Sequence, residues 1–244
     1  MGKAYAEELS RRGISTVLIS SSPRISVLCE HLHKTYQVEC DYVIADLTRH
    51  EDILAAADAI NAKYEVFLLV NNAGLGGSRK FEKTETEEID RIIQLNVAAP
   101  SLLTHTLIPN LLRQERAFVL NVSSMVAYTP IGYKMVYPAS KAFVNAFSFG
   151  LRAEFKKRGL SVSVVCPGAM ATSKDIRKRI EAQGLLGKLT LVPPEKVARK
   201  SIRQTFRGRK EITVTPLSYF FTKLVPSSIR IPILTRIVRR EITE

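Results

Sequence analysis

Short apolar runs alternate with amphipathic stretches over most of this chain. Five of the runs are rich in aliphatic and β-branched residues: Ile14–Ile19, Val38–Ile44, Glu65–Val70, Ala117–Val122 and Leu160–Cys166. Runs of this length and composition are typical of strands buried on both faces of a parallel sheet. The regular alternation with helical patterns predicts an α/β, Rossmann-like doubly wound fold, with a last strand over 211–214.

Helical patterns separate these runs and carry their own end signals. Gly2–Leu9 is followed by two arginines and Gly13, which is a typical helix end. Thr48 and Thr84 are each followed by a glutamate three residues later, the spacing of a capping box at a helix start. Further helices are expected over 23–36, 134–157 and 193–207.

A serine, a tyrosine and a lysine are the first candidates for chemistry. Tyr137 and Lys141 are four residues apart, so a helix places them on one face. An ammonium beside a phenol favours the phenolate and predicts a tyrosine pKa below the usual value of about 10. Such a tyrosine can give a proton to a carbonyl oxygen or take one from an alcohol. Ser124, just after the run Ala117–Val122, could hydrogen-bond the same oxygen; Ser123 is the alternative serine.

A tyrosine and a lysine at this spacing are by themselves also common on solvated helix faces, but here further residues accompany them. These are Asp46, the run Asn71-Asn72-Ala73-Gly74, Asn96 and Pro167-Gly168. With Ser124, Tyr137 and Lys141 they resemble the short-chain dehydrogenase/reductase family, and the resemblance extends from Gly2 to about Thr215. Within the family, the chain looks most like the bacterial DltE-type oxidoreductases. It looks less like the 17β-hydroxysteroid and 3-oxoacyl reductases.

The resemblance implies reversible carbonyl/alcohol oxidoreduction with NAD(P)(H), acting on CH–OH donors. In this scheme Tyr137 is the acid/base, and Lys141 lowers its pKa and holds the cofactor ribose. Ser124 orients the carbonyl, and Asn96 holds a water that relays protons to the lysine. Without the resemblance, Asn96 is interpreted as a capping or surface asparagine.

The resemblance also implies a cofactor site along the carboxyl ends of the strands. Gly2 is the last glycine of the family's phosphate-binding turn, at the start of the first helix. Asp46 and Leu47 would hold the adenine, although Asp46 also suits a plain turn; Thr172 would lie near the nicotinamide, although it also suits a helix N-cap. The complete set is Gly2, Ser21, Arg24, Asp46, Leu47, Asn72, Ala73, Gly74, Tyr137, Lys141, Pro167, Gly168 and Thr172.

The residues after the first apolar run favour NADP(H) over NAD(H). NAD enzymes of this fold place an acidic residue there, whereas NADP enzymes omit it and supply positive charge. This chain has three serines, Ser20 to Ser22, with Arg24 close behind. The alternative is that Arg24 is simply an exposed residue at the start of the next helix.

One element of the family pattern is missing from this sequence. Family members begin with a strand and a Gly-rich turn before the helix that starts at Gly2. That strand would be central in a sheet of order 3-2-1-4-5-6-7, so we expect two strand edges to be left unpaired inside the core. We interpret the absence as a truncated sequence rather than a natural protein that lacks the strand.

Composition narrows the remaining possibilities. With 244 residues, 45% hydrophobic and 24% charged, one soluble globular domain is the natural reading. The N-terminus has no signal-peptide pattern and no apolar run is long enough to span a membrane, so we expect a cytoplasmic protein.

The spacing of the cysteines (Cys29, Cys40, Cys166) suggests that they are reduced and structural, and the histidines lack the companions of a zinc site. The net charge of +13 favours anionic partners, but no nucleic-acid-binding signature is present.

Two loops suggest a largely apolar substrate, fatty-acyl or steroid-like. The expected pocket walls are Met125, Val126, Tyr128, Ile131, Tyr133, Met170 and Leu185. The stretch 173–192, with Gly184 and Gly187, is a candidate lid that excludes water. Its Lys174, Arg177 and Lys178 suit either an acyl carrier's phosphates or a solvated face.

Two surfaces suggest partners. Ala139, Ala142, Ala146 and Gly150 form a small-residue stripe, which suits close packing on the sheet or, as in the family, a homodimer or homotetramer interface. The segment 216–244 is expected to be a basic amphipathic tail beyond the 1–215 domain, suited to a membrane surface, its own domain or a partner subunit. A catalytically impaired binding or scaffold protein and a peripheral membrane protein therefore remain the alternative functions.

Overall fold

The computed structural model describes residues 1–170, 191–240 and 242. Its strands are β1 (Thr16–Ser20), β2 (Cys40–Ile44), β3 (Leu68–Asn71), β4 (Ala117–Val122), β5 (Leu160–Cys166) and β6 (Glu211–Thr213). Every pairing between them is parallel. The predicted doubly wound α/β fold is therefore confirmed, with each strand inside or next to an apolar run of the sequence.

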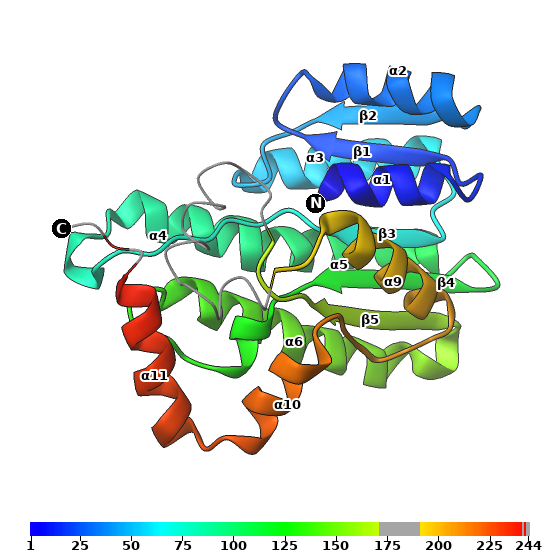
Figure 1. The fold of residues 1–244 in the computed structure, drawn as a ribbon. Helices are drawn as coiled ribbons and strands as arrows, with labels where there is room; N and C mark the ends of the chain where they lie inside the picture. The colour runs from blue at the N-terminus through cyan, green and yellow to red at the C-terminus, as the bar shows by residue number, and fades with distance from the viewer. Residues whose placement is uncertain (171–190, 241, 243–244) are drawn as a thin grey trace.

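Helices cover both faces of the strands (Figure 1). α1 (Gly2–Ser10) packs against α9 (Pro194–Phe206) on one face, and α3 (His50–Lys63) packs against α5 (Ala99–Leu111) on the other. α2 (Ile25–Tyr36) lies against β1 and β2, and α6 (Val136–Phe155) lies against β5. The other helices among the described residues are α4 (Thr86–Ile93), α10 (Pro216–Leu224) and α11 (Ser227–Arg239). Short helical turns lie at η1 (Phe81–Lys83), η2 (Gln94–Ala98), η3 (Met125–Tyr128) and η4 (Lys156–Arg158).

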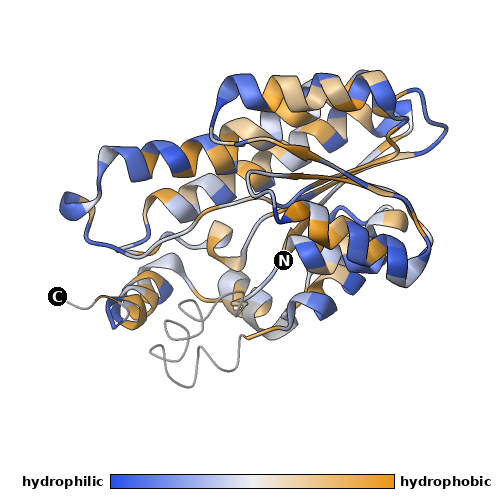
Figure 2. Ribbon diagram, turned by 90° about the horizontal axis from the view of Figure 1, so that it is seen from above, coloured by the Kyte–Doolittle hydropathy of each residue, from blue (hydrophilic) through white to orange (hydrophobic). Residues whose placement is uncertain are grey.

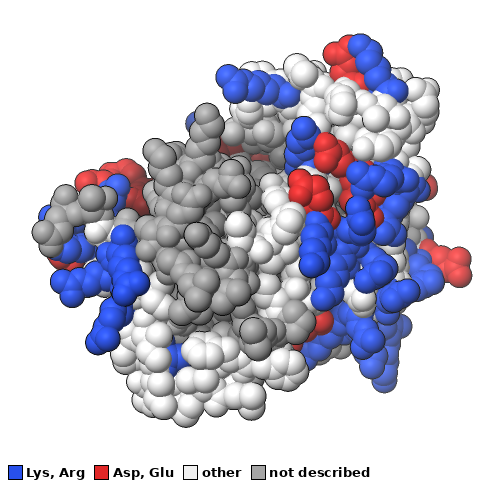
Figure 3. Space-filling model, in the orientation of Figure 1, with Lys and Arg blue, Asp and Glu red and all other residues white. Residues whose placement is uncertain are grey.

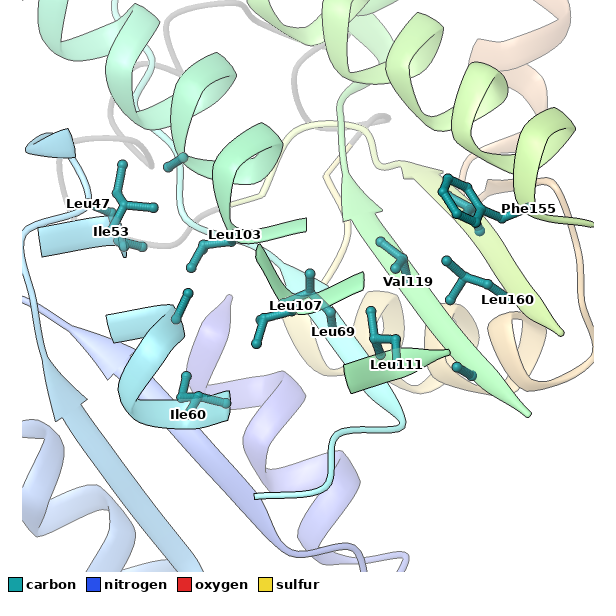
Figure 4. Close-up of a cluster of buried hydrophobic side chains, with 14 residues drawn as sticks. Leu47, Ile53, Ile60, Leu69, Leu103, Leu107, Leu111, Val119, Phe155 and Leu160 are labelled. Atoms are coloured by element: carbon teal, nitrogen blue, oxygen red, sulfur yellow. The ribbon is translucent and has the colours of Figure 1, made fainter. Parts of the chain in front are cut away.

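The core follows from the predicted amphipathic patterns. The strands and the helix sides that face them consist mostly of hydrophobic residues, whereas hydrophilic residues lie mostly on the outer helix sides (Figure 2). One cluster joins α3 and α5 to the sheet, and Ile53, Leu107, Leu111 and Val119 are almost completely buried in it (Figure 4). This cluster anchors the strands whose carboxyl ends carry the candidate site.

The strands form two sheets instead of one. β1 pairs with β2, and the other sheet has the order β3-β4-β5-β6. Among the described residues, β1 and β3 therefore each have one edge without a neighbouring strand. Both strands line a cavity of about 930 Å³. The expected pair of open edges is present, at the place where a central strand would lie.

Two predicted helix caps are wrong. α3 begins after Arg49 with no side-chain cap, because the Thr48 hydroxyl donates to Asp46 instead. α4 begins after Glu85, and the Thr84 hydroxyl donates to the Lys80 carbonyl. In both cases a nearby oxygen within the preceding turn competes for the hydroxyl.

Candidate active site

The candidate catalytic residues come from three elements that meet at the carboxyl edge of the larger sheet. Ser124 follows β4 as the N-cap of η3, and Tyr137 and Lys141 lie in the first turns of α6. Asn96 lies in η2, a π-helical turn between α4 and α5. Pro138 fixes the start of α6, because a proline is tolerated only in the first turn of a helix.

Lys141 is a buried cation at this edge. Its side chain is 5% exposed, and its Nζ donates to the Val122 carbonyl over 2.9 Å. Nζ lies 6.0 Å from the centre of the Tyr137 ring. Burial lowers the pKa of Lys141 to about 8, so a large share of the molecules carries a charged ammonium at neutral pH.

The expected acidification of Tyr137 is wrong for this structure. Burial raises the pKa of Tyr137, and a hydrogen bond with the Ser124 side chain offsets only part of that rise. Lys141, with its Nζ 6.0 Å from the ring centre, does not reverse this rise. Tyr137 is consequently a neutral phenol, which is the protonation state that a proton donor to a carbonyl oxygen requires.

The two neighbouring serines have different partners. The Ser123 hydroxyl is buried and donates to the Lys141 carbonyl over 2.9 Å, which ties the end of β4 to α6. The Ser124 side chain instead hydrogen-bonds Tyr137. Of the two, the structure places Ser124 beside the phenol.

Asn96 is buried and holds a neighbouring loop. It is 1% exposed, so the capping or surface interpretation is wrong. Its Oδ1 accepts from the Leu75 N–H and its Nδ2 donates to the Leu75 carbonyl, each over 2.8 Å. Nδ2 also donates to Ser140 Oγ, and Ser140 in turn donates to the Tyr137 carbonyl. Asn96 thus connects the loop after β3 to the turn of α6 that carries Tyr137.

Two glycines in that loop allow the close approach. A Cβ on Gly74 would lie 3.1 Å from Asn96 Oδ1 and 3.2 Å from Lys141 Nζ. A Cβ on Gly76 would lie 3.2 Å from the Tyr137 ring. The loop that contains Gly76 is expected from the sequence to border the cofactor and substrate. The contact of Ser140 with Asn96 was not predicted, although its position three residues after Tyr137 on the same helix was a signal.

Part of the predicted cofactor set lines the large cavity. These are Gly2, Leu47, Asn72, Ala73 and Lys141, and the candidate catalytic residue Asn96 lies in the same wall. The side-chain oxygens of Asn71 and Asn72 are buried there without a hydrogen-bond partner. Asn71 Nδ2 donates to Thr104 and Asn121, so Asn71 ties β3 to β4 as expected.

Other predicted cofactor residues lie outside the cavity wall. Ser21 and Arg24 are exposed beyond β1. The Asp46 carboxylate accepts from the N–H and hydroxyl of Thr48, the contacts of a turn residue, and they lower its pKa. Pro167 and Gly168 follow β5, with the Pro167 carbonyl accepting from Met125 N–H. Thr172 and the candidate lid through residue 190 lie outside the described residues.

Several residues that were expected to line the substrate pocket have other contacts in the structure. Met125 packs into a buried cluster with Val144 and Val164. The Tyr128 hydroxyl binds Glu211 and lies 3.2 Å from Cys166 Sγ. Tyr133, four residues before Tyr137, adopts a left-handed backbone with φ of 66°, which is uncommon for a non-glycine residue. Leu185 lies outside the described residues.

Comparison with known proteins gives a consistent result. The sequence pattern of the family described as short chain dehydrogenase matches residues 1–183. The chain is 34% identical over 177 residues to the very-long-chain 3-oxoacyl-CoA reductase of Anas platyrhynchos, covering 70% of this chain and 57% of that protein. It is 33% identical over 177 residues to the inactive hydroxysteroid dehydrogenase-like protein 1 of Homo sapiens, covering 71% and 53%. The chain therefore spans a little over half the length of these relatives.

A solved structure agrees with the fold. The short-chain dehydrogenase from Sphingobium yanoikuyae in complex with NADPH superposes with a TM-score of 0.79 at 28% identity, covering 87% of this chain and 82% of that one. Within the part of the chain that the structure describes, no helix is both long and apolar enough to cross a membrane.

Proposed function

Because the chain belongs to the short-chain dehydrogenase family, we propose that it interconverts a carbonyl and a secondary alcohol using NADP(H). The substrate is largely apolar, fatty-acyl or steroid-like. The observation that carries the proposal is the convergence of Ser124, Tyr137, Lys141 and Asn96 at one sheet edge. The DltE-type subgroup and a cytoplasmic location stay predictions.

The residues at this edge fit a dinucleotide. Asn71 and Asn72, whose side-chain oxygens have no hydrogen-bond partner, line the cavity together with Gly2. Gly2 is the start of α1, and a helix N-terminus favours an anion. The dinucleotide would be held by Gly2, Asn72, Ala73 and Lys141, with Ser21 and Arg24 on its adenosine side. No acidic residue lies in 20–24, which favours NADP(H). When bound, the cofactor supplies or takes the hydride.

The protein's own residues then move and place the proton. Tyr137, kept neutral by burial, donates its proton to the substrate oxygen, and Ser124 hydrogen-bonds that oxygen. Lys141 stabilises the resulting phenolate with its positive charge. Asn96 is a positioning residue, because its side chain is fully engaged by Leu75 and Ser140.

Replacing the phenol tests the proposal. Tyr137→Phe should lower kcat for NADPH-dependent ketone reduction by about 10²–10⁴-fold, the usual contribution of a positioned general acid. NADPH binding, followed by its fluorescence, should persist. Tyr42→Phe, on β2 and 40% exposed, is the matched control and should leave kcat unchanged. Unchanged turnover in Tyr137→Phe would dismiss the assignment.

An impaired binding or scaffold protein is the second candidate. The open edges of β1 and β3 next to Gly2 favour it, as does the similarity to a relative whose name calls it inactive. Titrating the chain with NADPH separates the two candidates. A fluorescence change that saturates supports the enzyme, whereas no change at millimolar NADPH supports the scaffold.

We further propose that α10 and α11 contact a membrane surface. Five large apolar side chains are exposed there, on Phe220, Phe221, Leu224, Ile229 and Ile233, with exposed arginines at 236, 239 and 240. Apolar residues beside basic ones suit an anionic bilayer surface. α11 also docks on its own domain, because Arg230 donates to the Tyr128 carbonyl and Thr235 accepts from Gly132 N–H.

Vesicle flotation tests this contact. Phe220→Ser combined with Leu224→Ser should lower the fraction bound to phosphatidylserine vesicles at least about tenfold, because each side chain loses over 1 kcal/mol of apolar burial. Val27→Ser with Ile44→Ser removes equally exposed apolar side chains elsewhere and should have no effect. Equal loss in both variants, or no flotation of the parent protein, would contradict the proposal.

A further inference from the structure

Two cysteine side chains meet between α2 and β2. Cys29 on α2 is 3% exposed, and Cys40 at the start of β2 is half-buried. Their Sγ atoms are 2.7 Å apart. A disulfide bond is about 2.05 Å long, so the two sulfurs need to move only a short distance toward each other to bond. We propose that Cys29 and Cys40 are an oxidation site that forms an intramolecular disulfide and joins α2 to β2.

The surroundings hold the two sulfurs together and isolate them. The Cys29 thiol lies 3.4 Å from the Asp41 carbonyl, and the Thr16 hydroxyl lies 3.4 Å from Cys40 Sγ. The Asp41 carboxylate, which Lys63 and Tyr64 at the end of α3 bind, acts electrostatically on Cys29. Cys166 is fully buried on β5 beside Tyr128 and Asn145. It therefore matches the expectation of a structural cysteine.

The bond can form by exchange with a small-molecule disulfide of the glutathione type. The more exposed Cys40, as thiolate, attacks one sulfur of the reagent, forming a mixed disulfide and releasing one thiolate. The Cys29 thiolate then attacks Cys40 Sγ and releases the second thiolate. The two protein thiols are oxidised by two electrons in total, the reagent disulfide is reduced, and the protons pass to the leaving thiolates.

The second exchange step should limit the rate. Burial, with the neighbouring Cys40 and Asp41, raises the pKa of Cys29 to about 12. The thiolate that must attack is consequently scarce at neutral pH. Its fraction, and with it the closure rate, should therefore rise with pH.

The location gives the bond a consequence. β2 pairs with β1 alone, and β1 has its other edge on the cavity, so this unit has few hydrogen-bonded neighbours in the described chain. The disulfide would close a short ring across α2 and the start of β2. Restricting the unfolded chain in this way should raise the thermal midpoint by roughly 5 °C and slow amide exchange over residues 25–44.

The experiment uses the whole protein with oxidised glutathione as the reagent. After incubation near pH 8.5, denaturation and thiol titration should find one free thiol instead of three, and peptide mapping should find Cys29 linked to Cys40. Dithiothreitol should restore all three. Three remaining thiols, a persistent glutathione adduct on Cys40, or linkage to Cys166 would overturn the proposal.

Variants assign the two steps. Cys29→Ser should stop at the glutathione adduct on Cys40, whereas Cys40→Ser should not react, because Cys29 is buried. Cys166→Ser, the matched control, should still form the bond. If a serine variant does not fold, the peptide map of the unaltered protein still decides the outcome. None of these readouts depends on NADPH turnover.

Discussion

At the scale of single residues, the site depends on how burial sets protonation. The sequence places an ammonium near a phenol, and the simple expectation is an acidified tyrosine. In the structure desolvation raises the pKa of Tyr137 and lowers that of Lys141 to about 8. Burial therefore shifts both residues toward their neutral forms. Keeping Lys141 charged in the folded protein costs about 3 kcal/mol relative to the unfolded chain.

The buried lysine should produce a measurable pH dependence of stability. Between pH 8 and 10 the unfolded chain keeps the Lys141 proton and the folded protein loses it, so stability rises with pH. We expect the free energy of unfolding of the parent protein, relative to Lys141→Met, to increase by about 2 kcal/mol over this window. Urea denaturation at several pH values measures it. A constant difference between the two proteins would contradict the prediction.

At the scale of elements, α6 serves two surfaces. Its buried side carries Lys141, while the small-residue stripe of Ala139, Ala142, Ala146 and Gly150 is exposed. The alternative prediction, that this stripe packs on the sheet, is therefore wrong. The exposed Phe143, stacked on Phe147 with ring centres 5.7 Å apart, extends the same face. A homodimer or homotetramer interface stays the prediction for it.

An arginine in the stripe tests that interface. Ala146→Arg should reduce the mass measured by light scattering from a multiple of the 27.3 kDa chain to the chain itself, since a charge would be buried without a partner. Ala59→Arg, at an exposed small residue on α3, is the matched control and should leave the mass unchanged. A parent protein that is already monomeric would contradict the prediction.

At the scale of the whole molecule, two features stand out: the open strand edges of β1 and β3, and a basic surface over α9. The cavity between β1 and β3 is bounded on one face by Tyr5, Ala6 and Leu9 of α1 and on the other by Leu95 and Ala99. Lys and Arg side chains gather over α9 and the adjoining loops (Figure 3). α9 and the residues after it present Lys196, Arg199, Arg203, Arg207, Arg209 and Lys210 as exposed cations.

Supplying a strand should repair the open edges. A fused segment of six Val, Ile or Ala residues and a two-glycine turn before Met1 should increase the free energy of unfolding by about 2 kcal/mol or more, through apolar burial and new ladder bonds. Amide exchange should slow in both β1 and β3, and NADPH affinity should rise. The same fusion with a central proline is the control. Equal effects from both fusions would contradict the prediction.

The sequence by itself determined the strands, the helices and the candidate catalytic residues of this protein. Apolar runs and helical periodicity are local properties, and Tyr137, Lys141 and Ser124 are recognisable by their spacing. Helix caps were less predictable, because Thr48 and Thr84 had competing partners one turn away.

Only the tertiary structure decided how these residues work. Four features depend on how separate segments of the chain pack together. They are the direction of the Tyr137 pKa shift, the partners of Asn96, the exposure of the α6 stripe and the meeting of Cys29 with Cys40. The physical reason is that desolvation and packing are set by everything that surrounds a side chain. Local pattern carries no record of those surroundings.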